Sequence, residues 1–424
     1  MKPIRYLNKM YKMKSFGLLF VFVIFIVTSC SKDELTPIKP VIIPVKVFEE
    51  IWKTRIYEAP LENVGSRNAY FYKGVYILAG DHYSHIDPTI YAYDIKTGSK
   101  KWKIKQSGNY QEPGYNITGK DHVLIMSDAT GIAAFDLEKK QLIWEDLHND
   151  KNEFGLVGQL PILGNFVYKG ITEGSFYGPA KMIRYELMTG KKETLVDVPI
   201  DGIWSHTISP PAFWTDTNND TIMIIINGKS NIDYSPQNSP TDLWAVNLST
   251  KKVVWKIDSI MAVRTNLGSP PVIHQNSVIF GGDWSVYSVD IPTGKVKWRT
   301  QFPELGNFGN FNRTGLLLAG ENVYGNPDGY DIFSLDAETG NVKWHNKTLA
   351  ANCTPRMLYN DGMLITTSIG TGSVLIYDAE SGSLIHKEFS SIGYHTDVVY
   401  DKETNMYFVQ DFASAVGFRI NKPK

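Results

Sequence analysis

Cysteine is scarce in this sequence and its charge is balanced, and both features exclude whole classes of protein. Only Cys30 and Cys353 occur in 424 residues. Two cysteines cannot make a disulfide framework. The chain has 43 basic and 44 acidic residues, a formal net charge of -1. We therefore expect no overall attraction to nucleic acid or to an acidic surface.

Long hydrophobic runs are also missing, apart from one near the N-terminus. The run from Phe16 to Val27 follows a basic stretch and is short for a permanent transmembrane helix. It is typical of a secretory signal peptide, and it ends in Val-Thr-Ser-Cys at Cys30. This ending resembles the bacterial lipobox, in which cleavage leaves a cysteine that carries acyl chains such as palmitate. We predict a signal peptide over residues 1–29 and a membrane anchor at Cys30, with an uncleaved helix as the alternative.

The residues that follow Cys30 bear on localisation. Ser-Lys-Asp-Glu at residues 31–34 resembles the short acidic signal that exports lipoproteins to the cell surface in one Gram-negative phylum. We expect an outer-membrane lipoprotein at the cell surface, and the alternative is one that faces the periplasm. Pro37, Pro40 and Pro44 make residues 30–44 a spacer that does not continue a helix.

One hairpin motif recurs through the rest of the chain. It is clearest as VYSVDIPTGKVKW from Val286 to Trp298 and as IFSLDAETGNVKW from Ile332 to Trp344. An alternating apolar strand ends on an acidic residue or Asn, a turn follows, and a second strand usually ends on Trp. The Asp accepts hydrogen bonds from the turn and Gly supplies a positive φ. The marker positions are Asp94, Asp136, Glu186, Asn247, Asp290, Asp336, Asp378 and Asn421.

The spacing of these markers predicts the architecture. They recur about every 43 residues, which fits four short strands per unit, the size of a propeller blade. Eight markers therefore predict an all-β, eight-bladed propeller over residues 45–424. The last copy lacks its outer strand, and residues 47–56 contain Trp52 in a strand without a partner of its own. We predict that this N-terminal strand completes the last blade and that the repeated Trp residues pack between blades.

The repeat resembles the PQQ-like repeat of quinoprotein alcohol dehydrogenases and of the propeller lipoprotein of the outer-membrane β-barrel assembly machinery. The resemblance implies the propeller fold and says less about function. The dehydrogenases of this family are expected to carry adjacent cysteines over the cofactor, and no Cys-Cys pair occurs here. PQQ-dependent oxidation is therefore rejected, and we expect neither a cofactor nor a metal.

The segments that enter each blade's first strand are expected to line one end of the central channel. Cationic, imidazole and aromatic groups recur in them, and such groups suit a carboxylate or sulfate ligand. The candidate ligand-binding residues are Arg67, Trp204, His206, Arg264, Arg313, Tyr394 and His395. The alternative is that these side chains pair with Asp or water around a water-filled channel.

Three other segments have features of a metal-binding or recognition site. Asp216 to Asp220 has calcium-loop spacing, but Thr221 follows where Gly is required, which favours a hairpin turn. His82 and His85 could ligate a metal, although a loop does not place them on a common face. The insertion from Asn227 to Asp242 has the composition of an exposed recognition loop, and a merely tolerated insertion fits equally well.

These observations favour a non-catalytic binding or scaffold lipoprotein. Its expected partners are the membrane, through Cys30, and a protein of an outer-membrane complex or a surface glycan. The alternative is a carbohydrate-active enzyme of the polysaccharide lyase kind, with His206 or His395 as the base. Release of unsaturated products from acidic polysaccharides would distinguish the enzyme from the binding protein.

Overall fold

In this computed structural model, the regular elements among the described residues are all strands. Within the part of the chain that is described, no helix is long and apolar enough to cross a bilayer. The chain divides into two units, Met1–Pro44 and Val45–Lys424, and the strands belong to the second. The described residues are 46–56, 64–65, 68–81, 89–105, 116–148, 153–155, 158–174, 178–231, 240–262, 268–302, 315–326, 331–347, 357–368, 372–389, 397–411 and 414–422.

Eight antiparallel sheets make eight blades, which are numbered here in sequence order. Blade 1 contains β2 (Val64–Gly65), β3 (Tyr70–Tyr72), β4 (Val75–Asp81), β5 (Thr89–Asp94) and β6 (Lys100–Lys105). Blade 2 contains β7 (Asn116–Lys120), β8 (Val123–Ser127), β9 (Gly131–Asp136) and β10 (Gln141–Leu147). Blade 3 contains β11 (Glu153–Gly155), β12 (Ile162–Leu163), β13 (Phe166–Glu173), β14 (Ala180–Glu186) and β15 (Lys192–Val198). Blade 4 contains β16 (Trp204–Ile208), β17 (Ala212–Thr215), β18 (Thr221–Asn231), β19 (Thr241–Asn247) and β20 (Lys252–Met261).

The second half of the chain forms blades of the same pattern. Blade 5 contains β21 (Val272–His274), β22 (Ser277–Gly282), β23 (Ser285–Asp290) and β24 (Lys295–Gln301). Blade 6 contains β25 (Leu316–Ala319), β26 (Asn322–Gly325), β27 (Asp331–Asp336) and β28 (Val342–Lys347). Blade 7 contains β29 (Leu358–Asn360), β30 (Met363–Ser368), β31 (Ser373–Asp378) and β32 (Leu384–Phe389). Blade 8 contains β33 (Val399–Asp401), β34 (Met406–Gln410), β35 (Ser414–Ile420) and β1 (Phe48–Arg55).

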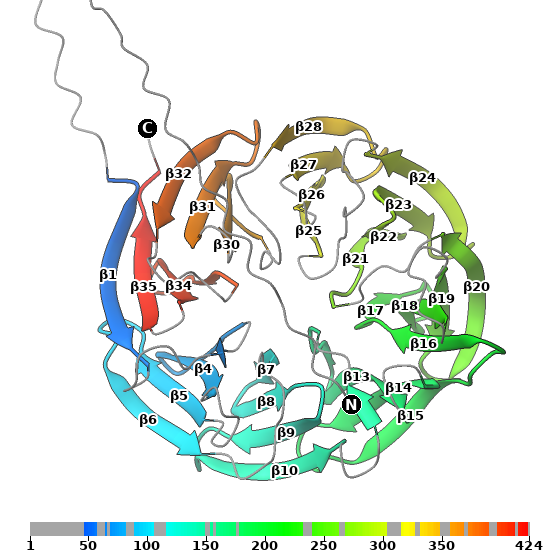
Figure 1. The fold of residues 1–424 in the computed structure, drawn as a ribbon, viewed down its shortest axis with the longest axis horizontal. Coiled ribbons are helices and arrows are strands. Elements are labelled where there is room, and N and C mark those ends of the chain that lie inside the picture. The colour runs from blue at the N-terminus through cyan, green and yellow to red at the C-terminus, as the bar shows by residue number, and fades with distance from the viewer. Residues whose placement is uncertain are drawn as a thin grey trace, which may run out of the picture. The chain divides into compact units, whose positions relative to one another are not determined.

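Each blade runs from an inner strand to an outer strand, as Figure 1 shows for β25 toward the centre and β28 at the rim. Three blades carry five strand segments because their inner strand is interrupted. In blade 1, for example, β2 and β3 both pair with β4. The predicted eight-bladed propeller of four-stranded blades is confirmed.

The N-terminal strand closes the ring. β1 pairs antiparallel with β35, from Phe48 opposite Ile420 to Arg55 opposite Ser414. The amide of Asn421 donates to the carbonyl of Val47 over 2.8 Å, which extends the ladder by one bond. The prediction that residues 47–56 complete the last blade is therefore confirmed, and β1 lies at the rim beside β35 (Figure 1).

The core lies between blades. Eight hydrophobic clusters occur among the described residues, and each joins one pair of neighbouring blades. The cluster around Trp52, Tyr76 and Phe408 joins blade 8 to blade 1 and so buries the closing strand. Burial of apolar surface between blades is the main force that holds such a ring together.

The repeated Trp residues connect six of the blades to the next blade, as predicted, whereas the outer strands of blades 3 and 7 carry no Trp. Four indole N–H groups donate to the carbonyl just after the marker residue of the next blade. The pairs are Trp52 with Ile95 at 3.0 Å, Trp144 with Leu187 at 2.8 Å, Trp255 with Ile291 at 2.6 Å and Trp344 with Ala379 at 3.1 Å. Trp102 and Trp298 also pack in clusters that span two blades.

The turn chemistry inferred from the motif is present as well. Asp94 accepts hydrogen bonds from the amides of Lys96 and Thr97, each at 3.0 Å, and from the Thr97 hydroxyl. Asp336 accepts the corresponding bonds from the amides of Glu338 and Thr339 at 3.2 and 2.9 Å. Short polar side chains thus satisfy turn amides that would otherwise lack partners.

Candidate functional site

A cavity of about 580 Å³ lies where the inner strands of several blades begin. Its wall includes the start of β25 at Leu316 and Leu317, together with residues next to β21, β29 and β33. The lining residues are Asn68, Ala69, Gln159, Pro270, Val272, Ile273, Gly315, Leu316, Leu317, Leu318, Met357, Leu358, Asp397, Val398 and Val399. The site is therefore assembled by blades that are far apart in the sequence.

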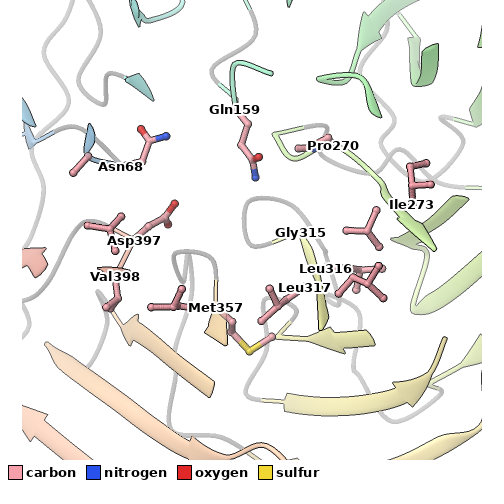
Figure 2. Close-up of a pocket in the computed structure, with 15 residues that line it drawn as sticks. Asn68, Gln159, Pro270, Ile273, Gly315, Leu316, Leu317, Met357, Asp397 and Val398 are labelled. Atoms are coloured by element: carbon pink, nitrogen blue, oxygen red, sulfur yellow. The ribbon is translucent and has the colours of Figure 1, made fainter. Parts of the chain in front are cut away.

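The wall of the cavity has an apolar side and a polar side. Figure 2 shows Leu317 and Met357 on one side of the space, and the side chain of Gln159 points into it from another. Asn68 and Asp397 lie on the same side as each other in this view. Concave sites with a mainly apolar wall and a few polar groups are typical of ligand and partner binding.

Backbone contacts fix the polar residues in place. The amide of Gln159 donates to the carbonyl of Gly268 over 3.0 Å. The side-chain oxygen of Asn68 accepts a hydrogen bond from the amide of Ile117 over 2.9 Å, which ties blade 1 to blade 2. The Gln159 side chain is thus held at the cavity by its own main chain and remains half-exposed.

The predicted channel-lining segments agree only in part with this wall. Asn68 directly follows the predicted residue Arg67, and Asp397 closely follows the predicted His395. Both lie in segments that lead into a blade's inner strand, and both line the cavity. The predicted residues that lie outside the described part of the chain are Arg67, Arg264, Arg313, Tyr394 and His395, and also Cys30. Their roles in binding or lipidation stay predictions.

Trp204 and His206 lie on β16, and neither is among the described residues that line the cavity. The His206 side chain is 3% exposed, and its Nδ1 lies 3.1 Å from Asn227 Nδ2. Burial lowers the pKa of His206, which keeps the imidazole neutral near pH 7. The neighbouring Asp242 carboxylate is also buried and is neutralised by Lys229 Nζ at 2.9 Å.

The insertion of blade 4 explains the burial of His206. Residues 227–231 continue β18 and pair with β16, so that His206 lies opposite Lys229. Asn227 and Asp242 are opposite each other on β18 and β19, and both are fully buried. The interpretation of the whole segment as an exposed loop is therefore wrong at both ends, because its first and last residues form paired strands. Residues 232–239 lie outside the described part.

The calcium-like segment is a hairpin turn between β17 and β18, as the sequence favoured. Asp216 Oδ1 accepts hydrogen bonds from the amides of Asn218 and Asp220, each at 2.8 Å. Asn219 has a φ of 65°, a conformation that Asn adopts more readily than most residues. His82 and His85 lie outside the described residues.

Sequence reasoning missed most of the cavity wall. Leu316, Leu317 and Leu318 were interpretable only as core residues of a strand, although all three are partly exposed. Alternation along the strand packs Leu316 and Leu318 against the layer between blades 5 and 6 and Leu317 against the layer between blades 6 and 7, so the run itself did not indicate that all three also reach a cavity. No pattern in the sequence around Gln159 predicts that this residue lines a cavity.

Comparison with known proteins supports the repeat and the fold. Residues 234–404 match the protein family described as outer membrane protein assembly factor BamB. No curated protein matches the chain in sequence. BamB from Moraxella catarrhalis is 12% identical with a TM-score of 0.57, over 88% of this chain and 100% of that chain.

Two further solved structures have the same fold. A europium-containing methanol dehydrogenase is 11% identical with a TM-score of 0.65, over 89% of this chain and 94% of that chain. The computationally designed Ika8 protein is 14% identical with a TM-score of 0.59, over 88% of this chain and 100% of that chain. Likeness at such low identity supports the fold alone. The chain is an eight-bladed β-propeller with repeats similar to those of the PQQ-like propellers, including BamB.

Proposed function

We propose that this chain is a non-catalytic scaffold lipoprotein of the outer membrane that binds a protein partner at the central cavity. The observation that carries this proposal is the apolar side of the cavity, formed by Leu316, Leu317 and Met357. A partner side chain buried there would act as an anchor, since a few well-packed apolar or aromatic contacts dominate most interfaces. The similarity of residues 234–404 to an outer membrane protein assembly factor supports the same class of role.

A protein partner fits the described wall better than a glycan. Glycan sites need many hydrogen-bonding groups around each sugar, whereas most of the described lining residues are apolar. The cationic residues predicted at the same end of the blades, Arg67, Arg264 and Arg313, would add donors for a carboxylate of the partner. Tyr394 and His395 complete the proposed surface, whereas Trp204 and the buried His206, which do not line the cavity, are left out of it.

Crosslinking in living cells tests the proposed site. A photoreactive residue in place of Leu317 should crosslink to one partner, whereas the same residue in place of Lys140, which lies in the turn between β9 and β10, should not. The further substitution Met357→Arg should abolish the Leu317 crosslink, because a charge cannot be buried in the apolar wall without a partner. Equal crosslinking at both positions would contradict the proposal.

The predicted cationic residues have their own test. Arg264→Ala combined with Arg313→Ala should weaken binding of that partner by at least roughly tenfold. Lys139→Ala combined with Lys140→Ala should change it little, because charges on exposed turns are screened by solvent and salt. The reverse ranking in a binding titration would exclude this assignment.

Membrane anchoring is proposed to depend on Cys30. The support is the apolar run that ends in Val-Thr-Ser-Cys. Cys30→Ser should abolish lipidation and release the protein from the membrane fraction, and persistent association would indicate an uncleaved helix. Protease treatment of intact cells then distinguishes surface display, where the protein is cleaved, from the periplasmic side, where it is protected.

A further inference from the structure

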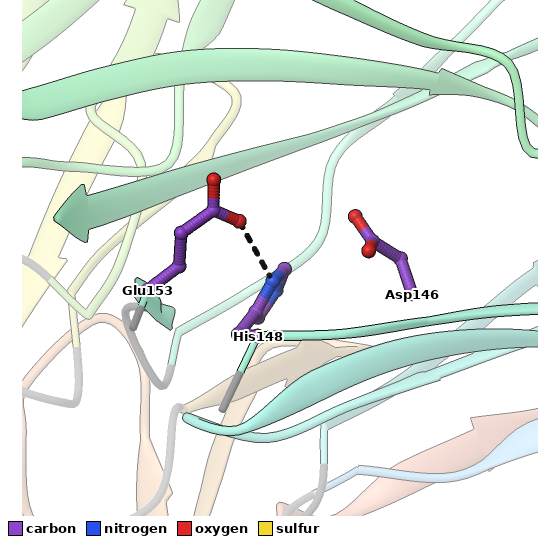
Figure 3. Close-up of side chains that lie close together, drawn as sticks. All are labelled: Asp146, His148 and Glu153. Atoms are coloured by element: carbon purple, nitrogen blue, oxygen red, sulfur yellow. Dashed lines mark ion pairs between the residues drawn. The ribbon is translucent and has the colours of Figure 1, made fainter. Parts of the chain in front are cut away.

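Three potential metal ligands converge between blade 2 and blade 3, and none of them is among the residues that line the central cavity. Asp146 lies near the end of β10, His148 follows that strand, and Glu153 begins β11 (Figure 3). One ligand atom from each of the three residues lies within 4.8 Å of the others. Sequence reasoning did not select these residues.

His148 is the most unusual member of this group. Its side chain is fully buried, and neither ring nitrogen has a hydrogen-bond partner among the described residues. Nδ1 lies 3.4 Å from Glu153 Oε2, beyond good hydrogen-bond geometry for a neutral imidazole. Buried polar nitrogens without partners are rare, and coordination to an ion is one way to satisfy them.

The backbone holds the group in place. The amide of His148 donates to the carbonyl of Thr130 over 2.7 Å, and the amide of Glu153 donates to the carbonyl of His148 over 2.9 Å. Asp146 Oδ2 accepts a hydrogen bond from the Tyr185 hydroxyl over 2.8 Å. Such an outer contact is what orients carboxylate ligands at metal sites.

A cation already lies between the two carboxylates. Lys192 Nζ is 2.9 Å from Glu153 Oε2 and 3.4 Å from Asp146 Oδ2, and its side chain is 29% exposed. This contact demonstrates that the two carboxylates attract positive charge, but the ammonium gives the nitrogens of His148 no hydrogen-bond partner among the described residues. The nearby ammonium of Lys169 is held elsewhere, by the carbonyls of Asp128 at 2.6 Å and Gly131 at 2.9 Å.

We propose that Asp146, His148 and Glu153 bind a divalent ion of the zinc class, which displaces the ammonium of Lys192 toward solvent. One imidazole and two carboxylates are a donor set that suits zinc, at bond lengths of about 2.0–2.2 Å. The three ligand atoms, which lie within 4.8 Å of one another, must move closer together to reach a common ion. The ion would join β10 to β11 and thus blade 2 to blade 3.

Metal titration of the purified full chain tests this proposal. After treatment with a chelator, the protein is titrated with Co²⁺, followed by its visible absorption, and with Zn²⁺, followed by calorimetry. We expect one saturable site per chain. Asp146→Asn and His148→Gln should each weaken binding at least roughly tenfold, because even loss of an outer contact commonly costs about that much. Tyr185→Phe should weaken it by a smaller factor.

Lys192→Met keeps the test decisive if the His148 variant fails to fold. Removal of the competing ammonium should tighten Zn²⁺ binding by roughly tenfold or more, whereas a cluster that serves only as an ion pair would gain no affinity for metal. His345→Gln is the matched control, since His345 lies 2.8 Å from Asp331 but has no second carboxylate in its described ion pairs. Its binding should equal that of the wild type.

Two results would overturn the proposal. One is the absence of saturable binding in both the wild type and Lys192→Met. The other is binding that Asp146→Asn and His148→Gln leave intact but that His82→Gln combined with His85→Gln removes.

Discussion

The two ends of the blades follow different rules. At the turn end, which carries the turns between the last two strands of each blade, the same residues recur from blade to blade. Asp336 of blade 6 lies there opposite Asn322, while Leu316 lies at the other end opposite Gly325. This other end is called the loop end here. It carries the cavity, and the residues that line the cavity differ from blade to blade. Repeated positions thus hold the ring together, and unrepeated positions are free to recognise a partner.

Substitutions at the turn end are expected to be destabilising, because the turns there contact the neighbouring blade. A Cβ on Gly98, Gly340 or Gly382 would lie 2.5 Å from the indole of Trp52, Trp298 or Trp344 respectively. The hydroxyls of Thr54 and Thr300 also donate to the carbonyls of Gly98 and Gly340, each over 2.6 Å. One substitution there therefore disturbs two blades.

Loss of the closing strand should have the largest effect. Deletion of residues 46–55 exposes the edge of β35 and removes the packing of Trp52 against blade 1, so we expect aggregation in place of a soluble folded monomer. Size-exclusion chromatography and circular dichroism check this outcome. Glu50→Ala, which changes an exposed residue of the same strand but keeps the strand, should remain monomeric. A monomeric, folded deletion variant would show that ring closure is dispensable.

Two glycines of blade 1 provide the next test. Gly98 and Gly74 both have positive φ, +67° and +74°, but a Cβ at Gly74 meets nothing within 4 Å. Gly74→Ala should cost only the backbone strain, about 1–2 kcal/mol. Gly98→Ala adds overpacking against Trp52, about 1–3 kcal/mol more. Denaturant unfolding measures the difference, and equal losses would mean that Trp52 yields without cost.

The turn aspartates should make the turn end sensitive to acid. The hydrogen bond from Lys101, with those from Thr97 and Lys96, lowers the pKa of Asp94 to about 2. The folded pKa lies below the unfolded value, so this stability is present above about pH 4 and is lost as the pH falls toward about 2. Because the carboxylate is exposed to solvent, we expect only about 0.5–1 kcal/mol.

Blade 4 supplies the control for that pH dependence. Asn247 occupies the same position as Asp94 and accepts bonds from the amides of Ser249 and Thr250 at 3.0 and 2.9 Å. Asp94→Asn should therefore keep the turn and flatten the loss of unfolding free energy between about pH 4 and pH 2. An unchanged pH profile would assign the acid sensitivity to other carboxylates.

The difference between the ends also explains what could be predicted from the sequence. The turns and the Trp contacts depend on local residues that repeat, so eight blades and the closing strand followed from the spacing. The cavity depends on which unrepeated residues face the axis, and no local pattern reveals Gln159 or Leu317. His206 was expected at the channel mouth, but residues of the blade 4 insertion pair with its strand and bury it.

Two glutamine substitutions compare the loop end with the turn end, and of all the variants they are expected to change stability the least. Gln159 points into the cavity at the loop end (Figure 2), whereas Gln141 begins β10 at the turn end and is exposed. Neither Gln159→Ala nor Gln141→Ala should change the unfolding free energy by more than about 0.5 kcal/mol, because neither side chain has a hydrogen bond or core contact among the described residues. Only Gln159→Ala should weaken the partner that crosslinks at Leu317, by roughly 2- to 10-fold, which is the loss expected for one hydrogen-bonding group. Titration of both variants with that partner measures the effect. Equal affinities would show that Gln159 does not contribute to partner binding, which would then depend on the apolar side of the cavity.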